Sequence, residues 1–281
     1  MALVKLNYFS RTLGMCMSLD VILPEKSQGI GVQTGDGWDG TEPLAALYLL
    51  HGTSDDQTIW QRRTSIERYV ADKKLAVIMP TTHLGAYTNQ QYGFRYFDYV
   101  AKEVPETCRT YFNLSSDREK NFVGGLSMGG YGALKIGMRC ADSFGYAIGL
   151  SSGCDRLSML AEKAKAFHSL SELETHRSDF TEGEYQQAQL FFLNFGSPER
   201  YLASEDDNLF QIAESRTKQG LVMPKIWMVC GTEDFALKPN REFHAHLERL
   251  GVPHDYHEAP GIHDWLFWDT HIQEALEWLP L

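Results

Sequence analysis

The run NFVGGLSMGGYGALKIGMRC, residues 121–140, restricts the possible folds of this chain more than any other segment. An apolar stretch leads into Gly124 and Gly125, and small residues follow Ser127 from Gly129 onward. This order fits a strand, a tight turn and a helix. A G-x-S-x-G nucleophile elbow needs that arrangement, because side chains two residues from the serine would collide with the neighbouring strand and helix. We therefore expect Ser127 in a strained turn between a central strand and a helix.

Short apolar runs alternate with helical patterns along the rest of the chain. The predicted strands are Met15–Leu23, Leu44–Leu50, Leu75–Met79, Phe122–Leu126, Tyr146–Leu150, Ile226–Cys230 and His254–His257. The predicted helices are Thr64–Asp72, Tyr96–Tyr111, Met128–Arg139, Pro239–Leu250 and Trp265–Leu279. Most of these strands are apolar throughout, as strands covered on both faces are. The sequence therefore predicts one α/β domain over residues 1–281, with a mostly parallel, doubly wound sheet and helices on both faces. An antiparallel orientation is left open for the first strand.

Two segments interrupt this alternation. Ser27–Pro43 is rich in glycine and turn-forming residues, so we expect a long loop there. Its glycines do not match a phosphate-binding fingerprint, and its aspartates lack the spacing of a calcium loop. Cys154–Asp207 is polar, helical in pattern and without a predicted strand. We expect it to form a small cap over the carboxyl edge of the sheet, where open α/β sheets bind ligands.

A second G-x-S-x-G match, centred on Ser151, follows the next predicted strand. It leads into CDRLSML, which lacks the small residues of an elbow helix. In a fold built on a nucleophile elbow, one strand follows the elbow, the next ends at the acid and the last ends at the histidine. Counting from Ser127 satisfies this order, whereas counting from Ser151 leaves one strand missing. We expect Ser127 to be the nucleophile and Ser151 to be a strand-end turn residue.

A serine hydroxyl needs a neighbouring imidazole to accept its proton, and the imidazole needs a carboxylate on its other nitrogen. The strand Ile226–Cys230 is followed by Gly-Thr-Glu-Asp-Phe, so Asp234 is the predicted acid and Glu233 the alternative. Either acid could instead cap the following helix. His263 lies in the loop after the last predicted strand, where chain order places the base.

An oxyanion formed at an acyl carbonyl needs two backbone N–H donors. The amide after the nucleophile, that of Met128, is the first candidate. The second is Thr53, because the strand ending in Leu50 runs directly into His-Gly, and glycine allows the turn that points the next N–H inward.

The formal net charge is −11, with 26 Lys and Arg against 37 Asp and Glu. Such a field repels nucleic acid and anionic membrane surfaces, so a small neutral or weakly charged substrate is the expected partner. The five cysteines lack ligand spacing, and their odd number indicates reduced thiols. The N-terminal segment has no signal-peptide pattern, so we expect a cytoplasmic protein. No pattern predicts a metal or a cofactor.

With these residues in place, the chain resembles the esterase D-like branch of the α/β hydrolases, and most of all the bacterial tributyrin esterase and acetylesterase group. The matching stretches are LYLLHGTSDDQTIWQRRTSIERY, VIMPTTHLGAYTNQQYGFRYFDYVAKEVPE, REKNFVGGLSMGGYGALKIGM, CGTEDF and GIHDWLFWD. The resemblance implies the α/β-hydrolase fold and a cofactor-free serine carboxylesterase for acetyl or butyryl esters, carried by sugars, xylan fragments or hydroxycinnamates. It gives triad roles to Ser127, Asp234 and His263 and oxyanion roles to the Thr53 and Met128 amides. It also implies that four residues lie near the substrate: Trp60, Tyr87, Gln91 and Trp265.

Three alternatives stay open at this point. S-formylglutathione hydrolases are thioesterases that share the His-Gly turn, the elbow and the triad order, although their loop has Thr-Cys where this chain has Thr53-Ser54. Acyl transfer to another alcohol would use the same acyl-serine. A scaffold kept only for binding is disfavoured, because such scaffolds usually lose a triad member. The sequence also leaves a homo-oligomer open.

Overall fold

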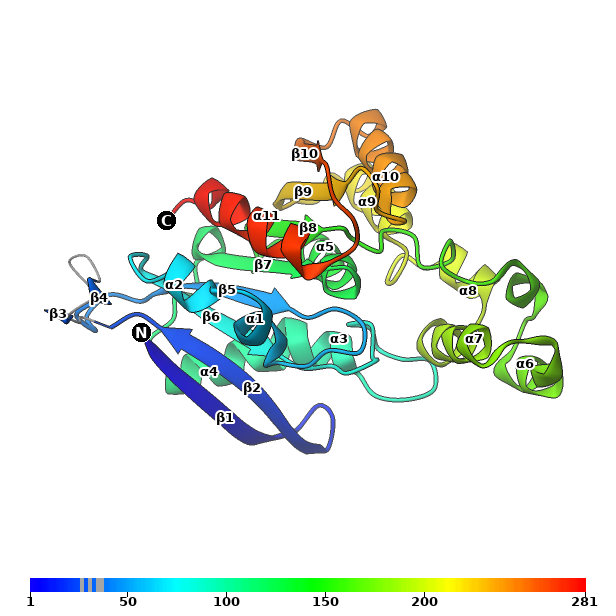
Figure 1. Cartoon of the computed structure of the whole chain (residues 1–281), viewed down its shortest axis with the longest axis horizontal. Helices are drawn as coiled ribbons and strands as arrows, with labels where there is room; N and C mark the ends of the chain where they lie inside the picture. The colour runs from blue at the N-terminus through cyan, green and yellow to red at the C-terminus, as the bar shows by residue number, and fades with distance from the viewer. Residues whose placement is uncertain (26–27, 30–31, 34–37) are drawn as a thin grey trace.

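The computed structural model describes residues 1–25, 28–29, 32–33 and 38–281, and its centre is an eight-stranded sheet (Figure 1). The order across the sheet is β1-β2-β6-β5-β7-β8-β9-β10. Its strands are β1 (Ala2–Ser10), β2 (Met15–Leu23), β5 (Ala45–Leu50), β6 (Leu75–Pro80), β7 (Asn121–Leu126), β8 (Tyr146–Leu150), β9 (Lys225–Gly231) and β10 (His254–Ala259). From β6 to β10 all neighbours are parallel, while β2 is antiparallel to both β6 and β1. The mostly parallel sheet is therefore confirmed.

Strand β1 is the one long strand that the sequence analysis did not predict. Its side chains alternate between half-buried and exposed, because it lies at the edge of the sheet and pairs only with β2. Leu3 and Phe9 are on its exposed side, so its apolar residues do not form the alternation with polar residues that usually signals a strand.

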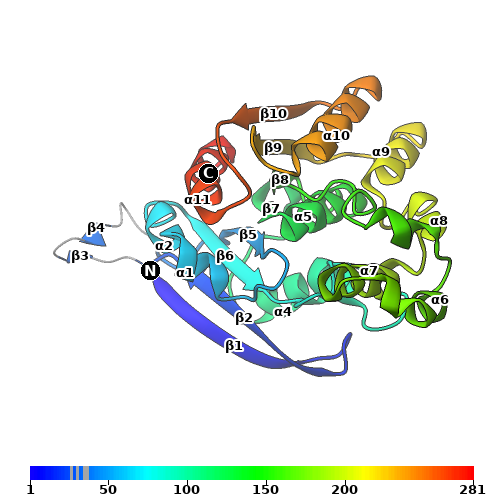
Figure 2. The ribbon, with the colours of Figure 1, turned by 45° about the vertical axis from the view of Figure 1, so that its right-hand side comes forward.

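Helices cover both faces of the sheet, as Figures 1 and 2 show. The α-helices are α1 (Ile59–Arg63), α2 (Ile66–Tyr69), α3 (Tyr96–Asp98), α4 (Val104–Tyr111), α5 (Met128–Arg139), α6 (Leu170–Thr175), α7 (Glu182–Phe195), α8 (Pro198–Leu202), α9 (Leu209–Lys218), α10 (Leu237–Arg249) and α11 (Trp265–Trp278). A π-helical turn, η1 (Tyr99–Glu103), joins α3 to α4, and short 3₁₀ turns are η2 (Arg118–Lys120), η3 (Glu162–Ala166) and η4 (Arg177–Asp179). Helices α1, α2 and α11 bury one apolar cluster against the sheet, and α3, α4, α5, α9 and α10 bury the other.

Most predicted helices agree with the structure, and α5 has the predicted bounds. In place of the helix predicted over 64–72 the structure has the shorter helix α2, which is preceded by α1. Helix α9 was not predicted. The segment 154–207 is helical throughout its regular structure and carries η3, α6, η4, α7 and α8, which lie beyond the main body of the sheet in Figure 1.

The predicted long loop over 27–43 lies partly outside the described residues. Within the described part, Gln28–Gly29 (β3) and Val32–Gln33 (β4) pair as a short antiparallel ladder. The remainder that is described, from Trp38 onward, contains no strand before Leu44.

The close approach of α5 to the sheet accounts for the glycines of the elbow. A Cβ at Gly129 would lie 2.5 Å from the carbonyl oxygen of Leu50 and 2.6 Å from that of His51. A Cβ at Gly125 would lie 2.6 Å from the carbonyl oxygen of Gly129. These obstacles are backbone atoms, which cannot rotate away, so any larger residue must push helix and sheet apart.

We predict that Gly129→Ala lowers the free energy of unfolding by about 1–3 kcal/mol, the usual cost of overpacking a close-packed site. Gly183→Ala is the matched control, because Gly183 lies in helix α7 and nothing comes within 4 Å of the added Cβ. The control should be stabilised by up to about 1 kcal/mol, since alanine is the better helix former. Urea unfolding followed by circular dichroism measures both, and a Gly129→Ala protein as stable as wild type would contradict the steric account.

Candidate active site

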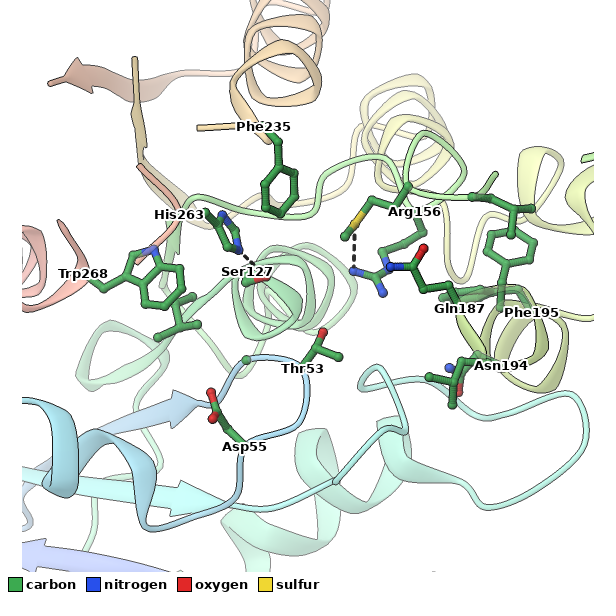
Figure 3. A pocket seen from close by; sticks show the side chains of 16 residues that line it. Thr53, Asp55, Ser127, Arg156, Gln187, Asn194, Phe195, Phe235, His263 and Trp268 are labelled. Atoms are coloured by element: carbon green, nitrogen blue, oxygen red, sulfur yellow. Dashed lines mark hydrogen bonds between the residues drawn. The ribbon is translucent and has the colours of Figure 1, made fainter. Parts of the chain in front are cut away.

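Three polar side chains meet at the carboxyl ends of the central strands. Ser127 follows β7, Asp234 follows β9 and His263 follows β10. His263 Nε2 lies 2.9 Å from Ser127 Oγ, and its Nδ1 lies 2.9 Å from each carboxylate oxygen of Asp234 (Figure 3 shows the first contact). A carboxylate only accepts hydrogen bonds, so the neutral imidazole carries its proton on Nδ1 and leaves Nε2 free to accept the serine proton.

The Asp234 carboxylate is fully buried, and its environment keeps it ionised. Burial alone would raise its pKa, but the hydrogen bonds from His263 and from the Ala236 amide at 2.7 Å outweigh burial and hold the pKa below its ordinary value. A buried anion of this kind orients the imidazole and would stabilise its protonated form.

Glu233, the alternative acid, has a different place. Its carboxylate is exposed and accepts the Gly261 amide at 2.7 Å, while its own amide donates to the Gly261 carbonyl at 3.0 Å. These bonds tie the loop after β9 to the loop after β10. The structure thus brings Asp234, and not Glu233, against His263.

Two aromatic rings enclose the His263 imidazole. The ring of Phe235 lies 4.3 Å from it, and the ring of Trp268 stands perpendicular to it at 4.9 Å. Phe235 is 64% exposed, so it covers the imidazole from the solvent side. Sequence reasoning missed both residues, since no local motif marks a ring that packs on a histidine from another element.

Ser127 is held in a left-handed conformation, with φ 52° and ψ −115°. Its amide donates to the Leu150 carbonyl at 2.9 Å, and its carbonyl accepts the amides of Tyr131 and Gly153, each at 3.0 Å. The second G-x-S-x-G segment therefore packs directly beside the elbow. Its Ser151 is fully buried at the end of β8 and its amide donates to the Val229 carbonyl at 2.8 Å, the place of a strand-end turn residue.

The predicted oxyanion donors lie on the two segments that flank Ser127. Met128 is the first residue of α5, and the first amides of a helix have no intrahelical acceptor. Thr53 lines the pocket that contains Ser127, on the loop after β5. Buried His51 fixes this loop: its Nε2 accepts the Thr82 amide at 3.1 Å, and its Nδ1 lies 2.7 Å from the Gly52 carbonyl oxygen.

Ser127 and His263 open into a cavity of about 320 Å³ (Figure 3). Its other walls include Asp55, Phe235 and Trp268 from the main body of the fold. The segment 154–207 supplies much of the remainder, through Arg156, Met159, Leu160, Gln187, Leu190, Phe191, Asn194 and Phe195.

The four residues predicted near the substrate lie one layer behind this lining. Trp60 is buried, donates from Nε1 to the Leu50 carbonyl at 3.1 Å and packs against Trp265 with ring centres 5.2 Å apart. Trp265 in turn packs on Trp268, which does line the cavity. Tyr87 is fully buried and donates to the His51 carbonyl at 2.9 Å, and the Gln91 amide donates to the carbonyl of the lining residue Asn194 at 3.0 Å.

Comparison with known proteins shows the family to which this chain belongs. A model of the Esterase family, described as "Putative esterase", matches residues 10–279. The chain belongs to the Esterase family. It is 30% identical over 281 residues to an acetyl esterase of Caldicellulosiruptor saccharolyticus, with 99% of this chain and 98% of that protein covered.

Two solved structures from Staphylococcus aureus agree with this assignment. One is fluorophosphonate-binding serine hydrolase F, which is 33% identical, with a TM-score of 0.80 and coverage of 99% of this chain and 98% of that chain. The other is an S-formylglutathione hydrolase, which is 34% identical, with a TM-score of 0.78 and the same coverage. The predicted α/β-hydrolase fold and the resemblance to bacterial esterases are confirmed, and this member of the Esterase family is a serine hydrolase of carboxylic esters.

Three further observations concern the described residues alone. No helix among them is long and apolar enough to cross a membrane. No group of three or more His, Cys, Asp or Glu side chains in the same ranges could hold a metal ion. All five cysteines are free thiols.

We predict that His51 makes the stability of this esterase depend on pH. Burial lowers the pKa of His51 to about 4 from the ordinary 6.5, although the Gly52 carbonyl opposes the shift. The unfolded chain therefore binds a proton first as the pH falls, so the stability from neutral His51 is complete above about pH 6.5 and is lost progressively as the pH falls from about 6.5 to about 4.

The lowered pKa corresponds to at most about 3 kcal/mol. Between pH 7 and pH 4, urea unfolding should show wild type losing about 2–3 kcal/mol more stability than His51→Gln. Equal losses in the two proteins would show that His51 is not held in its neutral form by the fold.

Proposed function

We propose that this esterase hydrolyses short-chain acyl esters, acetyl or butyryl, through an acyl-serine intermediate at Ser127. The observation that carries the proposal is the hydrogen-bonded Ser127–His263–Asp234 array at the wall of a cavity of about 320 Å³. This volume is at the lower end of the range for small-molecule sites, about 300–1,000 Å³. Similarity to an acetyl esterase across nearly the whole chain supports the same substrate class.

In this mechanism Ser127 Oγ attacks the acyl carbonyl carbon as His263 Nε2 takes the hydroxyl proton. The tetrahedral intermediate collapses when the protonated His263 donates that proton to the leaving alcohol oxygen, and the acyl–serine ester remains. A water molecule then attacks the same carbonyl, His263 accepts one of its protons, and the proton returns to Ser127 Oγ as the acid leaves. Asp234 keeps the imidazole in the correct tautomer and stabilises its charged form.

The negative charge on the carbonyl oxygen would be met by the amides of Thr53 and Met128. The N-terminus of α5 carries the positive end of the helix dipole, so it favours charge developing beside Ser127. One such donor typically contributes about 3–4 kcal/mol to transition-state stabilisation.

The segment 154–207 acts in this proposal as a cap on a single α/β-hydrolase domain, since much of the cavity wall comes from it. It would set both the acyl length and the alcohol, with acylated sugars and hydroxycinnamate esters as candidates. Five free thiols fit a reducing compartment, which supports the expectation of a cytoplasmic enzyme.

Thioester hydrolysis is the second candidate, because an S-formylglutathione hydrolase of S. aureus is 34% identical over 99% of this chain. The same array would serve a thiolate leaving group. The loop after the His-Gly turn favours the oxygen esterase, since it carries Thr53-Ser54-Asp55 where the typical S-formylglutathione hydrolase loop has Thr-Cys.

We predict that kcat/KM for p-nitrophenyl acetate and butyrate exceeds that for the octanoate at least about tenfold, because the cavity is small. It should also exceed that for S-formylglutathione.

Ser127→Ala should lower every rate at least about 10³-fold with little change in Tm, since the substitution removes the nucleophile but no packing contact. If S-formylglutathione is preferred by orders of magnitude, thioester hydrolysis replaces short-chain ester hydrolysis as the proposed function. Wild-type rates in Ser127→Ala would contradict both.

A further inference from the structure

Arg156 lines the cavity beside Ser127, and the hydrolysis of a neutral ester makes no use of it. Its Nη1 donates to the thioether sulfur of Met159 at 3.5 Å, and its guanidinium carbon lies 5.7 Å from the centre of the Tyr131 ring. Neither contact supplies a negative charge. The cation is therefore held in place by neutral groups.

Among the described residues, no carboxylate contacts this cation. Its Nε is buried and has no hydrogen-bond acceptor among the described residues. No carboxylate in the described ranges lies within ion-pair distance of it. The charge of the neighbouring Asp155 favours the cation through space, but the Asp155 carboxylate accepts the Leu157 amide at 3.0 Å rather than contacting the guanidinium. A buried donor left unpaired costs about 1–3 kcal/mol. Burial also lowers the pKa of Arg156, although an arginine keeps its charge at neutral pH.

Lys135 is a buried cation with a structural role, and it gives a comparison for Arg156. It packs over the same ring, Tyr131, at 4.6 Å, but its Nζ forms an ion pair with Asp207 at 3.1 Å and donates to the Tyr131 hydroxyl at 3.1 Å. Within the described part of the chain Arg156 forms no such ion pair, and it lines the cavity instead. The glycine at position 153 leaves room for the Arg156 guanidinium, because a Cβ there would lie 2.8 Å from its Nη1.

The cavity has a positively charged lining residue, Arg156, and a negatively charged one, Asp55. Figure 3 shows Arg156 and Gln187 on the opposite side of Ser127 from Asp55 and Trp268. A second cavity, of about 400 Å³, shares the lining residues Gln187, Met159 and Phe235 with the first, but its charged lining residue is Asp155. Within the first cavity an anionic group is attracted to Arg156 and repelled by Asp55, and Asp155 repels it from the second cavity.

We propose that Arg156 binds a carboxylate borne by the substrate, so that the enzyme prefers carboxylate-bearing esters or thioesters to their neutral counterparts. This inference rests on the proposed function. A guanidinium matches a carboxylate with two parallel charge-assisted hydrogen bonds. The carboxylate belongs either to the acyl part or to the leaving group. In both cases Arg156 determines specificity and takes no part in bond making.

The test compares kcat/KM for two matched pairs of substrates. On the acyl side, the mono-p-nitrophenyl ester of adipic acid is compared with its methyl ester. On the leaving-group side, 4-acetoxybenzoate is compared with methyl 4-acetoxybenzoate. In Arg156→Met, we expect kcat/KM for the acid of at least one pair to fall at least about tenfold, mainly through KM. The methyl esters should change less than about threefold, and Arg156→Lys should keep part of the preference.

A loss confined to one pair assigns the carboxylate to the acyl part or to the leaving group. An unchanged acid-to-methyl ratio in both pairs overturns the proposal. Failure of the proposed function would look different, because wild type would then hydrolyse neither methyl ester.

A stability control separates recognition from structure. Arg156→Met should keep or raise the Tm, since it removes an unpaired cation, whereas Lys135→Met should lower the Tm because it leaves the Asp207 carboxylate without its partner. A similar loss of Tm in both variants would show that Arg156 holds the fold together and would overturn the proposal. Arg156→Gln repeats the kinetic test in a polar, uncharged form.

Discussion

At Ser127 the backbone turns through a left-handed conformation between β7 and α5, and helix and sheet lie so close that glycine is required at positions 125 and 129. This close approach places the first amides of α5 beside the serine hydroxyl. It also brings the end of β8 against the elbow, through the bond from Gly153 to the Ser127 carbonyl. Because β7, β8, β9 and β10 run parallel, the loops that carry Asp234 and His263 emerge at the same edge of the sheet.

Asp234 and His263 are positioned by contacts between the two loops that carry them. A Cβ at Gly231 would lie 2.2 Å from the Gly261 carbonyl oxygen, and Glu233 bonds to both backbone groups of Gly261. These contacts hold the two loops together. With the carboxylate of Asp234 buried, the hydrogen bond to His263 is made away from water, where it fixes the imidazole best.

The parts that the sequence predicted are those that local pattern and chain order determine. Ser127, Asp234 and His263 each follow a strand, so their places at one edge of the sheet could be predicted without knowing any tertiary contact. Strand β1 was missed because its exposed side carries Leu3 and Phe9, which hide the alternation. The pocket walls were missed because Arg156, Phe235 and Trp268 come to the cavity only through tertiary packing. The conspicuous aromatics Trp60 and Trp265 pack on each other behind those walls.

The central claim is that Ser127, and not the neighbouring Ser151, is the activated nucleophile. The most direct measurement is the mass of the folded protein after reaction with a fluorophosphonate, followed by mapping of the modified peptide. The account predicts one adduct per chain, on Ser127, because among the described residues this is the hydroxyl that both contacts an imidazole and opens into the cavity. An adduct on Ser151, or a folded protein that does not react, would contradict it.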